Sequence, residues 1–303
     1  MSTLYLAPRF LEHELEAELA RRGLHVRERV GRLFLCEGKA ADVIWADDVW
    51  ADVSEAPVES ISKAAAALRE FRLPFVHFSE RNHRRGELIA GQLKRQPVER
   101  LHFGAALPTG PWAGFSLPAP DRMWISTQLR ASVPLGEAEF HENKTDPPSR
   151  AYLKLWEAMT VHGIRPVRGA RVLDLGAAPG GWTWVLAHAG CEVLAVDKAP
   201  LEKTLARHRH VKTLQESAFA VDPEAVGDVD WLFSDIICYP ERLLQLVHRW
   251  RDSGRVGRFV CTVKFQGETD WDAIDAFLAI PGSRFVHQYH NKHELTWILS
   301  TVS

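Results

Sequence analysis

The fold is decided by the segment Asp174-Leu-Gly-Ala-Ala-Pro-Gly-Gly-Trp182 in the second half of the chain. Apolar residues on either side predict a strand over 171–175 and a helix over 182–189. The glycines permit a tight bend and let a ligand approach the backbone without striking a side chain. The free N–H groups that begin the helix can hold a negatively charged group. The segment therefore predicts a nucleotide-binding strand, turn and helix.

An acidic residue at the end of the next predicted strand supports this interpretation. Asp197 lies 21 residues after Gly176, where a carboxylate can accept both ribose hydroxyls of an adenosine-containing cofactor. The glycine order differs from the G-x-G-x-x-G pattern of nicotinamide-dinucleotide sites, so a nicotinamide cofactor fits less well. A turn that binds no nucleotide is the remaining alternative.

Strands and helices alternate from residue 150 onward, which is typical of a parallel sheet covered by helices on both faces. Strands are expected at 171–175, 192–196, 211–214, 230–234 and 258–264, and helices at 150–161, 182–189, 201–207, 240–252 and 271–279. Two further strands, at 284–290 and 295–302, flank a short polar loop. We therefore expect an α/β, doubly wound, Rossmann-like sheet that ends in an antiparallel hairpin.

The first 140 residues predict a smaller α/β domain. Strands are expected at 4–6, 30–36, 75–78, 101–107, 112–117 and 123–129, and helices at 9–22, 60–71 and 84–95. A polar stretch over 140–148 ends in two prolines and predicts the boundary. The expected domains are thus residues 1–140 and 141–303.

Composition excludes several classes of protein. The chain has 303 residues, long enough for two ordinary domains or one large one, and its 46% hydrophobic and 25% charged content is typical of a soluble globular protein. No apolar run is long enough to cross a membrane, and no secretory signal is expected. The four cysteines are widely spaced, so neither a metal site nor a disulfide framework is indicated. With 37 basic and 39 acidic residues, any nucleic-acid surface must be a local patch.

The segment around Gly176 resembles the cofactor loop of the FtsJ-like 2′-O-ribose methyltransferases. Within that family the chain is most similar to the bacterial group that acts on 23S ribosomal RNA of the large subunit. The resemblance runs from about residue 147 to the C-terminus. Other motifs that carry it are Pro148-Ser-Arg-Ala-Tyr-Leu-Lys154-Leu, Ser234-Asp235, Val263-Lys264 and His293-Glu294-Leu-Thr. It implies a cytoplasmic class I methyltransferase that uses S-adenosylmethionine, needs no metal or membrane, and has RNA as its partner.

The resemblance also implies the residues of the site. A catalytic Lys-Asp-Lys-Glu set falls on Lys154, Asp235, Lys264 and Glu294. The cofactor-binding positions that it implies are Asp174, Gly176, Ala177, Ala178, Pro179, Gly180, Gly181, Trp182, Asp197, Ser217 and Asp235. Ser217 stands where the family often has an acid that meets the adenine amino group, which puts the adenine contacts of this chain in doubt.

The predicted chemistry is alignment of a weakly nucleophilic ribose hydroxyl and assistance to the loss of its proton. Lys264 is the candidate for contacting that hydroxyl. A neighbouring Lys154 would lower the pKa of Lys264, whereas the two carboxylates would raise it, and sequence leaves the balance open. Taken singly, each of the four residues could be an ordinary surface charge or helix cap.

The first 140 residues resemble, more weakly, a shortened THUMP-type RNA-binding module preceded by a ferredoxin-like piece. Leu6-Ala-Pro-Arg-Phe-Leu and Gly110-Pro-Trp-Ala-Gly-Phe carry this resemblance. The candidate RNA-binding residues are Arg84, Arg85, Lys94, Arg95 and Arg150, and a solvated helix face is the alternative. Two other functions stay open: methylation of another RNA, a protein or a small molecule, and a non-catalytic, cofactor-binding ribosome-assembly protein.

Overall fold

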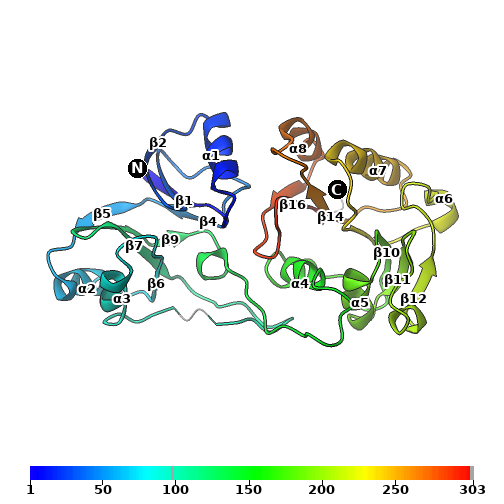
Figure 1. Ribbon diagram of the computed structural model, residues 1–303, viewed down its shortest axis with the longest axis horizontal. Helices are drawn as coiled ribbons and strands as arrows, with labels where there is room; N and C mark the ends of the chain where they lie inside the picture. Colours follow the sequence, from blue (N-terminus) through cyan, green and yellow to red (C-terminus); the bar gives the residue numbers. More distant parts are fainter. Residues whose placement is uncertain (97–98, 301–303) are drawn as a thin grey trace. The chain divides into compact units, whose positions relative to one another are not determined.

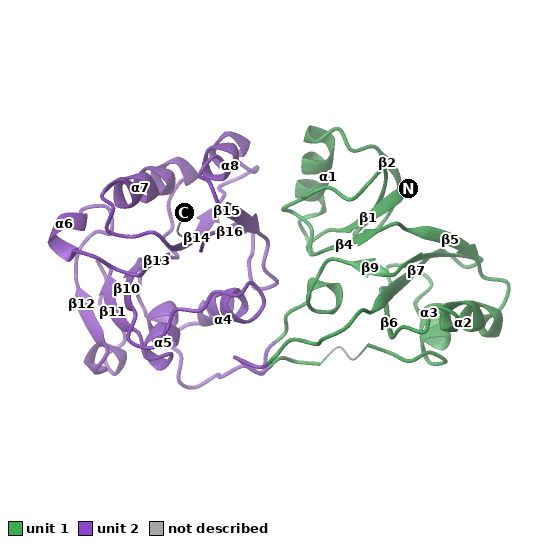
Figure 2. Ribbon diagram, turned by 180° about the vertical axis from the view of Figure 1, so that it is seen from behind, with its two compact units in different colours: residues 1–101, 106–139 green, residues 102–105, 140–303 purple. Residues whose placement is uncertain are grey.

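The computed structural model describes residues 1–96 and 99–300. The chain forms two compact units, residues 1–101 with 106–139 and residues 102–105 with 140–303 (Figure 2). The boundary predicted from sequence follows residue 140. No helix among the described residues is long and apolar enough to cross a membrane. All four cysteines are buried and carry free thiols.

The second unit is built on a seven-stranded sheet with the order β12-β11-β10-β13-β14-β16-β15. Its strands are β10 (Arg171–Leu175), β11 (Glu192–Val196), β12 (Val211–Leu214), β13 (Trp231–Ser234), β14 (Phe259–Lys264), β15 (Ser283–Val286) and β16 (Glu294–Leu299). Strands β10 to β14 run parallel, and β16 is antiparallel to both β14 and β15. This confirms the doubly wound sheet with an antiparallel C-terminal hairpin. Residues 301–302 of the last predicted strand lie outside the described residues.

Helices cover both faces of this sheet, as the alternating pattern predicts. They are α4 (Tyr152–Thr160), α5 (Gly181–His188), α6 (Pro223–Val226), α7 (Pro240–Asp252) and α8 (Trp271–Leu278). Helices α4 and α5 pack together on one face, and α7 and α8 on the other (Figure 1). The helix predicted over 201–207 is wrong, because only a 3-10 turn, η2 (Leu205–Arg207), forms there. The Glu202 carboxylate accepts the Leu205 N–H, the first of this short turn, at 2.9 Å.

The first unit contains two sheets, the first with the order β2-β3-β1-β4-β9. Its elements are β1 (Ser2–Leu6), α1 (Glu12–Arg21), β2 (Val26–Val30), β3 (Leu33–Glu37), β4 (Asp48–Ala51) and β9 (Gln128–Leu129). The strand predicted over 30–36 is present as β3 but begins at Leu33, and β2 before it was not predicted. Gly31 has a φ of 57°, so the chain turns there and β2 pairs with β3 as a hairpin.

The second sheet of this unit has the order β5-β8-β7-β6. Its elements are β5 (Ser54–Pro57), α2 (Ile61–Arg69), β6 (Phe75–His77), α3 (His83–Ala90), β7 (Ala113–Ala119) and β8 (Arg122–Ser126), followed by the short turn η1 (Pro134–Gly136). The strand predicted over 101–107 is absent, and the helix predicted over 84–95 ends at Ala90. A methyl group at Gly114 would lie 2.7 Å from the Trp50 ring, which shows how closely the two sheets pack.

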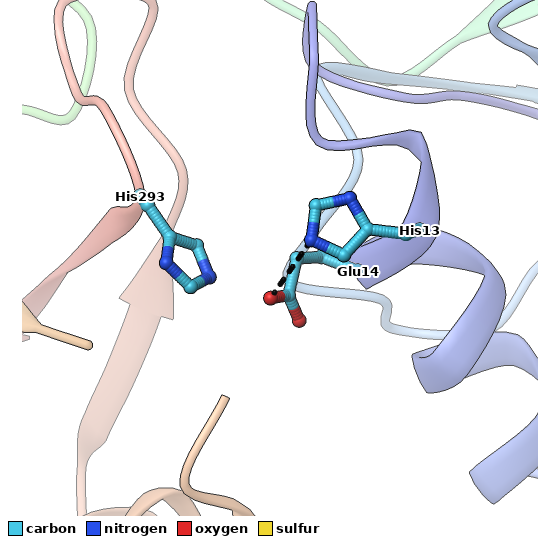
Figure 3. Close-up of side chains that lie close together, drawn as sticks. All are labelled: His13, Glu14 and His293. Carbon is cyan, nitrogen blue, oxygen red and sulfur yellow. Dashed lines mark ion pairs between the residues drawn. The ribbon is translucent and has the colours of Figure 1, made fainter. Parts of the chain in front are cut away.

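Helix α1 buries two carboxylates. Glu18 has no exposed surface and accepts the N–H groups of Ile44 at 3.0 Å and Trp45 at 2.8 Å. Glu14 is paired with His13 at 3.4 Å (Figure 3). The third side chain drawn in Figure 3, His293, belongs to the second unit and lies in the loop before β16.

Candidate active site

The loop between β10 and α5 is bent by glycines, as predicted. Gly176 has a φ of 78° and Gly180 a φ of 123°, a backbone region that favours glycine. A methyl group at Gly176 would lie 2.6 Å from the Ile236 side chain, and one at Gly180 would lie 2.4 Å from Leu205. The glycines therefore let the loop pack closely against neighbouring protein segments. From the sequence, we had expected the glycines to make room only for a ligand.

Two of the predicted cofactor residues direct their side chains into the protein. Asp174 is 1% exposed and accepts the Thr183 hydroxyl at 2.5 Å. Burial raises the pKa of Asp174 to about 7, with smaller contributions from nearby carboxylates. Trp182 is 3% exposed, and its indole N–H donates to the Ala151 carbonyl at 3.0 Å. These contacts join β10 to α5 and α5 to the start of α4. Both side chains therefore stabilise the loop from the protein interior and do not face a bound cofactor.

Asp197 follows β11 and is partly exposed beside the same loop. Its carboxylate accepts the Ala178 N–H at 3.0 Å and the Ala199 N–H at 2.9 Å, one on each oxygen. Because a carboxylate oxygen can accept two hydrogen bonds, both oxygens retain capacity for a diol. Ser217 lies in the turn after β12, where its carbonyl accepts the Ala220 N–H at 2.8 Å. The carboxyl ends of β10, β11 and β12 thus form one edge.

The same edge carries a compact cluster of two lysines and two carboxylates. Lys154 projects from α4, Asp235 follows β13, Lys264 ends β14 and Glu294 begins β16. The Lys154 amine lies 2.7 Å from the Glu294 carboxylate and 3.1 Å from that of Asp235. The Lys264 amine lies 2.9 Å from the same Asp235 oxygen and donates to the Asp235 carbonyl at 2.7 Å. The structure therefore brings all four predicted residues together.

This cluster, the Lys154–Asp235–Lys264–Glu294 cluster, is nearly neutral in total charge and is largely shielded from solvent. Its side chains are between 8% and 19% exposed, with Lys264 the most accessible. Burial alone would lower the pKa of Lys154, but Asp235 and then Glu294 outweigh it and raise that pKa above its usual value. Lys154 is therefore a fixed positive charge at neutral pH and is not available as a base.

The cofactor loop and the cluster adjoin. Gly176 of the loop packs on Ile236, the residue that follows Asp235. Beyond it the chain exposes two large apolar side chains, Ile237 at 82% and Tyr239 at 63%. Sequence reasoning missed both. The apolar run after Asp235, placed at the carboxyl end of a parallel strand, was the signal that could have found them.

The candidate RNA-binding residues differ in their surroundings. Arg85 donates to the Val58 carbonyl at 3.1 Å, Arg95 pairs with Glu87 at 3.1 Å, and Arg150 pairs with Glu142 at 2.9 Å; all three have partners within their own unit. Arg84 and Lys94 are exposed, and within residues 1–96 and 99–300 no ion-pair partner is found for either. Among the five candidates, only Arg84 and Lys94 are thus exposed without an ion pair in the described part of the chain.

Known proteins resemble this chain over most of its length. Residues 147–266 match the family model of the FtsJ-like methyltransferases. Among curated relatives, ribosomal RNA large subunit methyltransferase M of Alkalilimnicola ehrlichii is 34% identical, over 67% of this chain and 57% of that protein. The protein of the same name from Aromatoleum aromaticum is 29% identical, over 77% and 62%. That of Methylococcus capsulatus is 30% identical, over 84% and 69%. The chain thus spans less than two thirds of the first two relatives.

Proposed function

Because this chain belongs to the family of ribosomal RNA large subunit methyltransferase M, we propose that it is an S-adenosylmethionine-dependent 2′-O-ribose methyltransferase of large-subunit ribosomal RNA. The observation that carries the proposal is the Lys154–Asp235–Lys264–Glu294 cluster. It adjoins a glycine-bent loop and Asp197 at one edge of a doubly wound sheet. Open α/β sheets bind ligands outside the carboxyl ends of their strands. We expect the protein to act in the cytoplasm, where ribosomal RNA is its substrate.

The residues at this edge fit the cofactor that the family implies. We assign the ribose hydroxyls to the Asp197 carboxylate, and the methionine carboxylate to the N-terminus of α5. The adenine end falls near Ser217, where a hydroxyl and backbone replace the acid that relatives often have. When bound, S-adenosylmethionine supplies an electrophilic methyl group.

The cluster then serves the acceptor hydroxyl. We place the Lys264 amine against the ribose 2′-oxygen, where it passes the hydroxyl proton on to solvent as the oxygen is methylated. Asp235 holds that amine in place through its carboxylate and its carbonyl. Lys154, kept charged by Asp235 and Glu294, fixes the position of Asp235. Most of the rate advantage of such a site comes from alignment of the reacting atoms.

The proposal is tested by a labelling experiment on whole RNA. Purified protein is incubated with methyl-labelled S-adenosylmethionine and total RNA from cells that lack its gene, and the labelled nucleoside is then mapped. We expect one 2′-O-methylated nucleotide in large-subunit RNA. Label in protein or metabolite fractions and none in RNA would instead assign another acceptor. Cofactor binding without any label would favour a non-catalytic protein.

Replacement of Asp197 should weaken cofactor binding specifically. Two hydrogen bonds to a charged acceptor contribute roughly 1.5–3 kcal/mol each. Asp197→Ala is therefore expected to raise the Kd for S-adenosylmethionine by at least about tenfold, measured by calorimetry. Asp222→Ala is the matched control, because Asp222 also accepts a backbone N–H, that of Glu224 at 3.0 Å, but caps α6. An equal loss of affinity in both variants would contradict the assignment.

We further propose that the first unit, a shortened THUMP-like domain, contacts RNA through Arg84 and Lys94. The logarithm of the RNA-binding constant falls linearly with the logarithm of the salt concentration. Each phosphate contact that is lost should reduce the magnitude of that slope by about one. The double variant Arg84→Ala/Lys94→Ala should therefore bind RNA more weakly and with a slope lower by about two. Arg29→Ala/Lys63→Ala removes the same charge from residues that pair with Glu16 and Glu59. If both double variants bind RNA equally, the assigned surface is wrong.

A further inference from the structure

A second polar network lies directly behind the Lys154–Asp235–Lys264–Glu294 cluster. Its centre is Glu157, which is 2% exposed and follows Lys154 by three residues on α4, so the two side chains share one helix face. One Glu157 oxygen accepts the Tyr289 N–H at 2.8 Å. The other accepts the His290 N–H at 3.1 Å and lies 2.8 Å from the His290 ring nitrogen Nδ1. A buried carboxylate is costly unless such partners satisfy it.

These contacts bind α4 to the loop between β15 and β16. The same loop is bound to α4 a second time, because the Gln288 amide donates to the Lys154 carbonyl at 3.1 Å. Gln288 has no exposed surface, and its own oxygen accepts the Thr296 hydroxyl at 2.8 Å. The loop is therefore held by α4 on one side and by β16 on the other.

The loop ends at Glu294, the carboxylate that pairs with Lys154 at 2.7 Å. Helix α4 thus meets the segment 288–296 three times: through the Lys154 amine, the Lys154 carbonyl and the Glu157 carboxylate. Only the first contact lies in the cluster. The other two fix the backbone on which Glu294 is mounted.

We propose that Glu157 is a positioning residue that sets the place of Glu294 against Lys154 by clamping the backbone of Tyr289 and His290. The proposal rests on the proposed methyltransferase function for its kinetic consequence. Its structural consequence is independent of that function. If these contacts weaken, Glu294 moves away from Lys154. The Lys154 charge is then paired with Asp235 alone, and the Lys264 amine contacts the same Asp235 oxygen.

Glu157→Gln is the test variant, because it keeps the side-chain shape while one acceptor oxygen becomes an N–H₂ that faces backbone N–H donors. A displacement of about 1 Å at a reacting centre can cost on the order of 10²-fold in rate. We expect kcat to fall by about that factor, with the Kd for S-adenosylmethionine and the KM for RNA unchanged. A kcat equal to the wild type, or a parallel loss of cofactor binding, would overturn the proposal.

A second measurement does not depend on methyl transfer. Lysine side-chain NMR of the cofactor-free protein follows the titration of Lys154. The facing charged groups are Asp235, Glu294 and, across Asp235, Lys264. Release of Glu294 should lower the pKa of Lys154 in Glu157→Gln, and an unchanged titration would refute the clamp. If the wild-type protein is inactive on RNA, the Lys154 titration still tests whether Glu157 positions Glu294.

The first unit supplies a matched control for the loss of a buried carboxylate. Glu18 is fully buried and also accepts two backbone N–H groups, those of Ile44 and Trp45. Glu18→Gln should lower the Tm to a similar degree but leave both kcat and the Lys154 titration at wild-type values. If it reproduced the kcat loss of Glu157→Gln, that loss would reflect general destabilisation and the positioning role would be rejected.

Discussion

Lys264→Ala should severely impair methyl transfer while cofactor binding persists. The Lys264 amine is the most exposed charge of the cluster and is held at 2.9 Å and 2.7 Å by Asp235. Because we assign it to the acceptor hydroxyl, its loss removes alignment and proton handling together. General acid–base assistance contributes typically 10²–10⁴-fold, so kcat should fall by about 10³-fold. Labelled-methyl transfer under single-turnover conditions measures the loss, and calorimetry measures the Kd for S-adenosylmethionine.

The Lys264→Ala prediction has a clear control. Lys212 is an exposed lysine on β12, outside the cluster, and Lys212→Ala should retain wild-type kcat. Wild-type turnover in Lys264→Ala would remove this residue from the mechanism. A loss of cofactor affinity as large as the loss of kcat would show that Lys264 supports the cofactor pocket and does not handle the acceptor.

Asp235→Asn is expected to be at least as damaging, because one Asp235 oxygen lies between two ammonium groups. Without its charge the amines of Lys154 and Lys264, each about 3 Å from that oxygen, repel each other and lose their common anchor. We expect kcat to fall by 10³-fold or more, as for removal of a group that acts in a unit with its neighbours. Folding should persist, because the remaining side chain keeps its shape.

The pH dependence gives Asp235→Asn a distinctive signature. Asp235 is the strongest influence that raises the pKa of Lys154 against its burial. Its removal lowers that pKa, so Lys154 loses its charge at a lower pH, and the alkaline limb of the residual activity should move toward neutrality. The double variant with Lys264→Ala should be little worse than either single variant. Multiplicative losses in the double variant would argue that the two residues act separately.

Most of the second unit was predictable, because its signals are local. The glycine-bent segment, the apolar strands and the acid at residue 197 are each visible within a short window. The predicted doubly wound sheet is present, with its antiparallel hairpin. The four cluster residues were named from motifs, and their mutual contacts required the structure, since they come from four separate elements.

What sequence could not give depends on contacts between distant segments. The stretch 101–107 alternates like a strand, but Phe103 stacks on the Trp156 ring at 4.8 Å and the segment stays irregular. A single glycine, Gly31, turns the chain between β3 and the unpredicted strand β2, with which β3 pairs. Glu157 looked like any helix glutamate, because its partners Tyr289 and His290 lie more than 130 residues away.

Helix α4 has a consequence for how this chain can vary in length. Lys154 and Glu157 stand three residues apart, and each residue of an α-helix turns the next by about 100°. Insertion or deletion of one residue between them would rotate the amine and the carboxylate out of phase, so that one could no longer meet the segment 288–296 when the other does. The number of residues between Lys154 and Glu157 is therefore as constrained as the identity of the two side chains.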